Sequence, residues 1–448
     1  MANAPQTLTI RTYHVGFGDC FLLTFGYPKL ERHVLIDFGS TGVPKGIKLN
    51  QRMMEIAEDI KRRTKGKLHA VVATHRHKDH ISGFETKKGG KGTGDIIRSL
   101  KPDVVVQPWT EDPKLGTKAT GPRAAKTKRL TDKEFIVLPQ MQVAALSSMQ
   151  TVAQQTLLES RSVRYFDKSL KTQLAFLGES NINNPSAVKN LMTMAKNDYV
   201  YCGKKTALAK ALPGVKIDVL GPPTVQQTAK IKKQRANDPS EFWQFQANAM
   251  RSSEASSEGG MNLFPKYVRG KSPNFPIDAR WLIFHARLTR GNQLLQIVRM
   301  LDKAMNNTSV ILLFQIGKTR LLFPGDAQIE NWEYALDQKK YQQLLSSVNL
   351  YKVGHHGSRN ATPKSLWKLF KNKSEKKGGA NRLMSLMSTM EHKHGSEASH
   401  TEVPRKTLVN ELERESNLFS TQELKNKVFF HDTQLVFSEA RRTAKKKR

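Results

Sequence analysis

Three histidines and an aspartate stand within the six-residue segment HRHKDH, directly after an apolar run. The preceding residues 68–74 read LHAVVAT, which is typical of a buried strand, so we expect the cluster on a loop at the strand's carboxyl end. His75 and His77 are two positions apart and can face one ion, while Asp79 and His80 can reach a second. Imidazole and carboxylate suit zinc, manganese or iron. A merely polar loop would rarely combine all four residues, so the spacing predicts a metal site.

Two further clusters follow apolar segments in the second half of the chain. Asp326 comes just after a predicted hairpin, and the segment GHHGS follows the strand predicted at 349–353. Two neighbouring cations repel one another and need a shared anion, so Asp326 is the candidate bridging carboxylate, although an aspartate after glycine is most often a turn former. We expect at least one of His355 and His356 to bind the second metal. The other could hydrogen-bond the substrate or protonate the leaving group.

Apolar alternation and turn signals predict the elements that position these clusters. The opening residues indicate successive strands, and strands and helices then alternate, which is typical of helices packed on a sheet. We expect strands at 8–15, 20–25, 33–37, 68–74, 103–107, 216–220, 309–315, 319–323, 349–353, 383–388, 427–430 and 434–438. We expect helices at 50–63, 95–100, 140–160 and 404–415.

The distribution of these signals predicts a core that is interrupted once. Residues 1–108 and 280–440 would form the two halves of an α/β core. Between them, residues 109–279 would form a largely helical, basic insertion that contributes one core strand near 216–220. Residues 441–448 form a basic tail.

The balance of charges is strongly positive. The chain has 448 residues, and 73 lysines and arginines against 39 aspartates and glutamates give a net charge of +34. A solvated surface explains any single basic run, but the total predicts a polyanionic partner, namely nucleic acid. We find neither an apolar run of the ~20 residues that a membrane span needs nor a secretory signal. With only two cysteines, we expect a cytoplasmic protein that does not contact a membrane.

The motifs, taken in order, carry a resemblance to a known family. They are VGFGD at 15–19, LIDFG at 35–39, HRHKDH at 75–80, GD at 325–326 and GHHGS at 354–358. This set resembles the metallo-β-lactamase superfamily, and within it the hydrolase domain of the competence protein ComEC, whose NNxS motif is similar to residues 306–309. The resemblance covers about 1–108 and 280–440. ComEC-type proteins carry membrane helices, and none is expected here.

The resemblance implies an αββα sandwich with two divalent metal ions, zinc or manganese, at one edge. By its pattern His75 and His77 would hold the first ion, Asp79 and His80 the second, and Asp326 would bridge them. Asp37 and Asp19 would orient the ligand loops from behind. The superfamily usually supplies one more histidine before the bridging aspartate. His285 is the only histidine in that interval, and a buried structural role suits it better. The first ion would therefore be under-coordinated, weakly held or completed by His355.

The expected reaction is hydrolysis by metal-activated water, with Asp79, His355 and His356 in the catalytic centre. The positive charge favours phosphodiesters, so we expect a nuclease or phosphodiesterase acting on DNA or RNA. Candidate phosphate contacts beside the GHHGS loop are Lys352, Ser358 and Arg359. Two alternatives stay open: a small-molecule metallohydrolase acting on a lactone, thioester, β-lactam or cyclic nucleotide, and a non-enzymatic nucleic-acid binder on a hydrolase scaffold.

Overall fold

The computed structural model describes residues 4–115, 184–224, 305–358, 362–379, 381–395 and 402–437, together with a few isolated positions. The expected helix 140–160, His285, Arg359 and the tail 441–448 lie outside the described residues. The chain divides into two compact units, one comprising 1–131, 183–232 and 303–448, the other 132–182 and 233–302. The boundaries expected for the insertion, 109–279, therefore differ from those of the second unit. Residues 184–224, which were expected in the insertion, supply helices and strands to the first unit.

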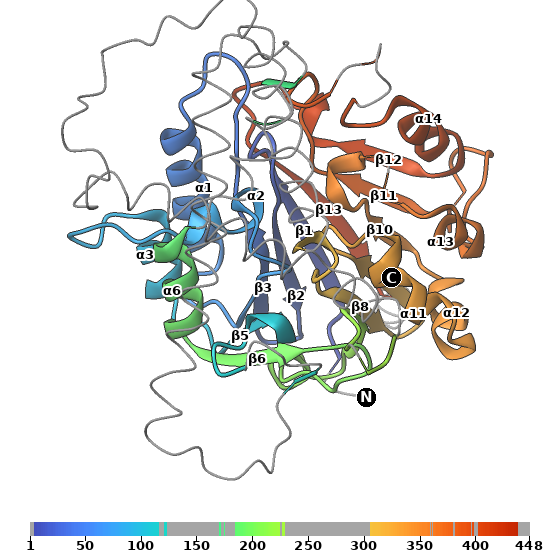
Figure 1. Ribbon diagram of the computed structural model, residues 1–448, viewed down its shortest axis with the longest axis horizontal. Coiled ribbons are helices and arrows are strands. Elements are labelled where there is room, and N and C mark those ends of the chain that lie inside the picture. Colours follow the sequence, from blue (N-terminus) through green and yellow to red (C-terminus); the bar gives the residue numbers. More distant parts are fainter. Residues whose placement is uncertain are drawn as a thin grey trace, which may run out of the picture. The chain divides into compact units, whose positions relative to one another are not determined.

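Two mixed sheets form the centre of the first unit (Figure 1). The seven-stranded sheet has the order β13 (Phe430–Val436), β1 (Thr7–Tyr13), β2 (Cys20–Gly26), β3 (Glu31–Phe38), β4 (Ala70–Val72), β5 (Val104–Pro108) and β6 (Lys196–Val200). The six-stranded sheet has the order β12 (Asn417–Ser420), β11 (Met384–Met387), β10 (Leu350–Lys352), β9 (Thr319–Phe323), β8 (Ile311–Ile316) and β7 (Lys216–Gly221). In each sheet one part is antiparallel, and the run from β3 to β6 and from β9 to β12 is parallel.

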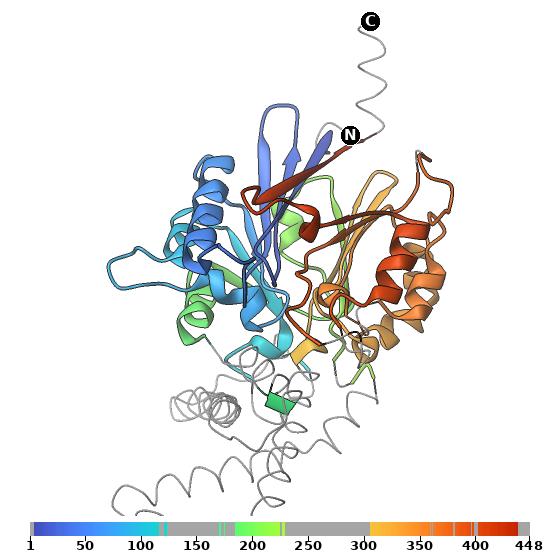
Figure 2. The same ribbon diagram turned by 90° about the horizontal axis from the view of Figure 1, so that it is seen from above.

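Helices cover the outer face of each sheet, so the unit has four layers, and Figure 2 shows the two sheets between them. Against the seven-stranded sheet pack α1 (Leu49–Arg63), α3 (Thr93–Ser99) and α6 (Pro185–Thr193). Against the six-stranded sheet pack α11 (Ile329–Leu336), α12 (Lys339–Leu345), α13 (Lys364–Leu369) and α14 (Lys406–Glu415). The short helices α2 (Lys78–Ile81) and α7 (Leu208–Ala211) and four single 3-10 turns complete the described elements. The expected α/β class is confirmed.

The central strands are apolar on both faces because both faces are covered. In β2, Phe21 and Leu23 belong to the core between the sheets, whereas Leu22 belongs to the core beneath the helices. The same alternation in β3 places Ile36 between the sheets and Leu35 toward the helices. Each sheet is thus covered on two sides, and the motif clusters lie at the strand ends.

Two strands were not expected, namely β6 and β12. Both are edge strands whose sequences, KNDYV and NLFS, mix polar and apolar residues without clear alternation, since an edge strand is only partly buried. The two strands expected at 427–430 and 434–438 are a single strand, β13, which pairs with β1 at the other end of the chain. Among the described residues, no helix is long and apolar enough to cross a membrane.

Candidate metal centre

Three strand ends bring together residues that are far apart in sequence. The loop after β4 leads into α2 with Asp79 and His80, the loop after β9 carries Asp326, and the turn after β10 carries His356. One ligand atom from each of these four side chains lies within 4.8 Å of all the others, and all four residues are buried. The expected clusters of both halves of the chain therefore meet in one group that could hold a metal ion.

The nitrogen and oxygen atoms of this group point at one another. His356 Nε2 lies 3.0 Å from Asp79 Oδ2 and 3.6 Å from Asp326 Oδ2. His80 Nε2 lies 3.1 Å from the same Asp326 oxygen. Asp326 Oδ2 is thus shared between two imidazoles that come from different sheets, as expected for a carboxylate at the centre of the group.

The opposite nitrogen of each imidazole is held from behind. His80 Nδ1 lies 2.9 Å from Asp37 Oδ2, and His356 Nδ1 lies 3.1 Å from the carbonyl oxygen of Ser388. Because both oxygens accept, each Nδ1 carries the proton and each Nε2 is turned toward the centre. Asp37 is itself fixed, since the backbone N–H and the hydroxyl of Thr74 each donate to it at 2.7 Å. Asp37 thus lies on the side of His80 that is turned away from Asp326.

Without a cation, the buried charges of the group compete. Burial by itself would lower the pKa of His80, but the charges of Asp326, Asp37 and Asp79 raise it well above its ordinary value. Burial would raise the pKa of Asp326, and His80 and His356 instead hold it well below its usual range. The carboxylates therefore need positive charge close by, and a divalent cation would supply it together with a set of O and N ligands.

His75 and His77 form a separate buried pair. His75 Nε2 lies 2.9 Å from His77 Nδ1, and the ring of His75 lies 4.2 Å from that of His80. Burial, followed by the charges of His80 and His77, lowers the pKa of His75 well below its ordinary value, so its ring is neutral. Within the described ranges, no third ligand atom converges on this pair as it does on the group around Asp326.

The turn after β10 has an unusual backbone. His355 and His356 have φ values of 43° and 52°, and Gly357 follows with 78°. Left-handed conformations are costly for residues with a Cβ and often mark functional sites. The turn is held by its N-terminal end, because the backbone N–H of His355 donates to Asp326 Oδ1 at 3.0 Å. His355 itself is half-buried, lies 2.8 Å through Nδ1 from Ser358 Oγ, and is not one of the four convergent residues.

Lys352, which was expected to contact phosphate, points into the protein instead. Its side chain is 2% exposed, and its ammonium forms an ion pair with Asp19, which is fully buried. Asp19 Oδ1 also lies 3.5 Å from His356 Nδ1. The lysine is directed inward because it ends a central strand, where the neighbouring carboxylates balance its charge. Ser358 is 8% exposed.

The glycines of the first two motifs permit close backbone packing against the DH turn. A Cβ on Gly39 would lie 2.4 Å from the backbone carbon of Asp79, and a Cβ on Gly18 would lie 2.2 Å from the carbonyl oxygen of Gly39. Gly18 also has a φ of 151°. The backbone N–H of Asp19 donates to the carbonyl of Asp79 at 3.0 Å. Both motifs thus hold the loop that carries two of the four convergent residues.

Sequence reasoning missed several residues around the centre. Thr74 and Ser388 hold Asp37 and His356, and neither has a feature in the sequence that marks it. The ring of Phe17 lies 4.5 Å from that of His356 and 4.3 Å from that of buried His394. Phe17 lies inside the VGFGD motif and His394 in the segment HKHG, so only these two had a signal.

The four convergent residues fit a bound metal ion. Besides the mixed carboxylate and imidazole donors, Asp79 Oδ1 is buried and has no hydrogen-bond partner among the described residues. A buried carboxylate oxygen without a donor is unfavourable unless a cation completes it. No protein-family model matches the chain, and no curated protein is significantly similar to it.

Proposed function

We propose that the chain is a metal-dependent hydrolase with the metallo-β-lactamase fold, and that its substrates are phosphodiesters in DNA or RNA. The convergence of Asp79, His80, Asp326 and His356 carries the proposal. Two facts about the framework support it: the four layers of helix, sheet, sheet and helix, and the position of every motif at a strand end facing the same group. Neither a structural turn nor a solvated loop would need four buried ionisable residues there.

Two divalent ions, zinc or manganese, would be held by this chain. Asp79, His80 and His356 would hold one, His75 and His77 would hold the other, and Asp326 would contact both. When bound, such ions lower the pKa of a coordinated water and polarise the scissile phosphoryl group. The ion at Asp79 would be the tighter one, because its donors already converge.

The protein's own residues orient the ligands and supply a proton. Asp37 and the carbonyl of Ser388 keep Nε2 of His80 and His356 turned inward, which restricts the geometry before any ligand arrives. His355 is the half-buried imidazole at the centre's edge, and its Nδ1 is engaged with Ser358. If the Ser358 hydroxyl donates to Nδ1, the remaining proton is on Nε2, where it can pass to a departing oxygen.

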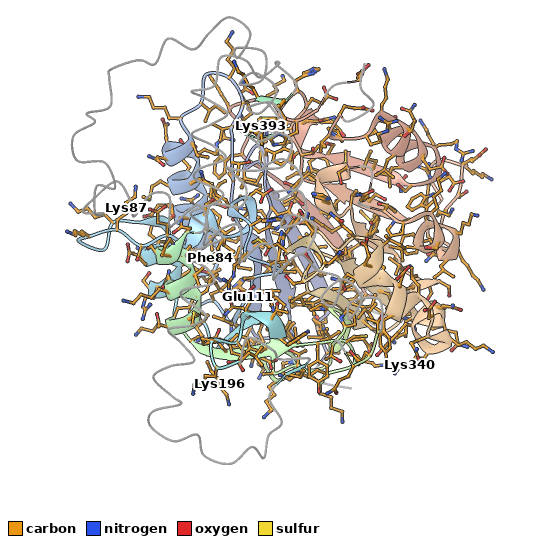
Figure 3. All side chains as sticks on the ribbon, in the orientation of Figure 1. Phe84, Lys87, Glu111, Lys196, Lys340 and Lys393 are labelled. Carbon is orange, nitrogen blue, oxygen red and sulfur yellow. The ribbon has the colours of Figure 1, made fainter. Side chains whose placement is uncertain are left out.

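The choice of phosphodiesters rests on charge. The net charge of +34 exceeds what solubility requires, and a phosphate backbone is the common polyanion that such a surface attracts. Figure 3 shows Lys87, Lys196 and Lys340 reaching outward from different sides of the described core, and all three are exposed. Each is an exposed positive charge that a polyanion could contact.

Cleavage of oligonucleotides tests the proposal. Purified protein with Mn²⁺ or Zn²⁺ is incubated with labelled single- and double-stranded DNA and RNA, and with a β-lactam and a generic phosphodiester as comparison substrates. Asp79→Ala should abolish cleavage, whereas Asp103→Asn, which removes an exposed carboxylate paired with Lys67, should leave it unchanged. An Asp79→Ala protein as active as wild type would exclude this site as the source of the activity.

Salt dependence separates this proposal from a small-molecule hydrolase. Binding through several phosphates should weaken with a log–log slope of about −0.9 per phosphate neutralised on duplex DNA. A hydrolase of lactones or thioesters would lose little affinity over the same range. Oligonucleotide binding without any cleavage, in the presence of metal, would favour the non-enzymatic binder.

A further inference from the structure

A second cluster of ligand-type residues lies beside the centre. It consists of Asp19, Asp37 and His80, whose ligand atoms also lie within 4.8 Å of one another. His80 belongs to both clusters, so the two are adjacent and compete for one imidazole. The contacts of Asp37, His80 and Asp19 distinguish the two clusters as sites for a divalent ion.

Two of the three residues in the second cluster already use the atoms that face it in hydrogen bonds. Both oxygens of Asp37 already accept hydrogen bonds from Thr74, and one of them also accepts from His80 Nδ1. Since His80 Nδ1 carries the proton in that bond, only its Nε2 can bind a cation, and Nε2 faces Asp326.

The third residue, Asp19, already has a cation. The ammonium of Lys352 forms an ion pair with Asp19 and also lies 3.9 Å from Asp326. Lys352 is 2% exposed, and its ammonium lies 5.8 Å from the ring of Phe21. A lysine this deeply buried costs much free energy unless carboxylates balance it, so Lys352 and Asp19 depend on each other.

We infer that Lys352 is a built-in counter-cation, a positioning residue that neutralises Asp19 and so directs the divalent ion to the group of Asp79, His80, Asp326 and His356. Asp19 is therefore not a metal ligand, although it lies among the ligands. The ammonium holds Asp19 in place whether or not metal is bound, and its proximity to Asp326 fixes one edge of the centre. The inference rests on metal binding by the chain but not on the identity of the substrate.

Charge-removing variants of this pair test the inference. The test variants are Lys352→Met, Asp19→Asn and the double variant. The controls are Lys67→Met, Asp103→Asn and their double variant, because the side chains of this ion pair are exposed, Lys67 by 45% and Asp103 by 53%. Two quantities are measured for each protein. One is the number of Zn²⁺ ions bound per chain with their dissociation constants, from metal analysis and chelator competition, and the other is the urea midpoint in EDTA.

The expected result has two parts. Asp19→Asn should keep the wild-type number of ions, with dissociation constants within about threefold, because no ligand is lost. In EDTA each single variant should lower the urea midpoint clearly, and the double variant should recover most of that loss. Lys352→Met should also bind Zn²⁺ at least about tenfold more tightly or take up one more ion, since Asp19 is then unpaired. The control cycle should show almost no coupling.

Two outcomes would overturn the inference. One is loss of a tightly bound ion in Asp19→Asn, as expected for His356→Ala, because Asp19 would then be a ligand. The other is additivity of the two single variants in the EDTA midpoints. If Lys352→Met does not fold, Asp19→Asn alone still decides the first outcome. Should the wild-type protein bind no metal, the metal proposal fails separately, and the EDTA cycle still decides whether Lys352 and Asp19 are coupled.

Discussion

At the scale of single residues, His80 connects two carboxylates, Asp37 and Asp326. Its Nδ1 is held by Asp37 at 2.9 Å, and its Nε2 faces Asp326 at 3.1 Å. The imidazole therefore lies between one carboxylate that orients it and one that can share an ion with it. Asp37 is the residue through which this orientation can be tested.

Asp37→Asn should weaken metal binding by about 10- to 100-fold, because the orienting carboxylate of His80 is lost while all metal ligands stay. Asparagine tolerates the left-handed backbone of this position, where φ is 55°, so the turn is preserved. Chelator competition measures the dissociation constant. Asp103→Asn serves as the exposed control. Unchanged metal affinity in Asp37→Asn would show that Asp37 has no part in orienting His80.

His33, far from the centre in β3, predicts a pH dependence of stability. Burial lowers its pKa to about 4, and its Nδ1 lies 3.1 Å from Thr24 Oγ1. In the unfolded chain its pKa is about 6.5, so its contribution is complete above pH 6.5 and is lost as pH falls toward 4. Between pH 7.5 and 5, wild type should lose about 2 kcal/mol more than His33→Gln in urea titrations. Equal losses in the two proteins would contradict this.

Residue identities in the centre were largely predictable from the sequence, and their partners were not. All four convergent residues were expected because ligand-type residues stood directly after apolar strands. Lys352 was expected to contact phosphate, since nothing in the sequence reveals that it points inward to Asp19. Ser388 acts through its backbone carbonyl, which no sequence pattern can mark.

At the scale of elements, the turn after β10 is the most constrained part of the site. His355 and His356 keep left-handed φ values of 43° and 52° although they are not glycines. The hydrogen bond from the His355 backbone to Asp326 and the burial of His356 hold this conformation. The turn thus stores backbone strain to place His356 opposite Asp79.

Replacing His355 by glycine or alanine measures that strain. Both variants lose the contact with Ser358, but only alanine keeps the Cβ that disfavours a positive φ. His355→Gly should therefore be more stable than His355→Ala by about 1 kcal/mol in urea titrations. The control is Lys364, the first residue of helix α13, where Lys364→Ala should be more stable than Lys364→Gly. Equal stability of the two His355 variants would mean that the turn relaxes at no cost.

All central strands of the described sheets were expected from the sequence, whereas two of the four edge strands, β6 and β12, were missed. The hairpin of β8 and β9 was expected within two residues because both strands are mainly apolar and a tight turn separates them. β6 was missed because its sequence, KNDYV, is half polar. The pairing of strands was harder to predict than their positions. β13 pairs with β1 through residues more than 400 positions apart, and Arg11 contacts Asp432 across the two strands.

At the scale of the whole molecule, the centre joins the two sheets. Asp79 and His80 come from the end of the seven-stranded sheet, and Asp326 and His356 from the end of the six-stranded sheet. A bound ion would therefore act as a cross-link between them, and its binding energy would add to the free energy of unfolding.

Metal removal should therefore lower the thermal stability. A free metal concentration of about 100 times the dissociation constant adds about 2.7 kcal/mol, which for a chain of this length corresponds to about 3 °C in the melting temperature. Calorimetry with Zn²⁺ and with EDTA measures the difference. Asp326→Asn should show little of this shift, because the central carboxylate is gone. A variant that is stabilised by metal as strongly as wild type would contradict the cross-link.

The metal content of the purified protein tests the central claim most directly. Wild type, His356→Ala and Asp103→Asn are dialysed against metal-free buffer containing no chelator, and zinc and manganese are counted per chain by elemental analysis. The structure predicts at least one ion per chain in wild type and Asp103→Asn, and its loss in His356→Ala. Less than one ion per chain in wild type after incubation with Zn²⁺ and Mn²⁺ would contradict the metal centre.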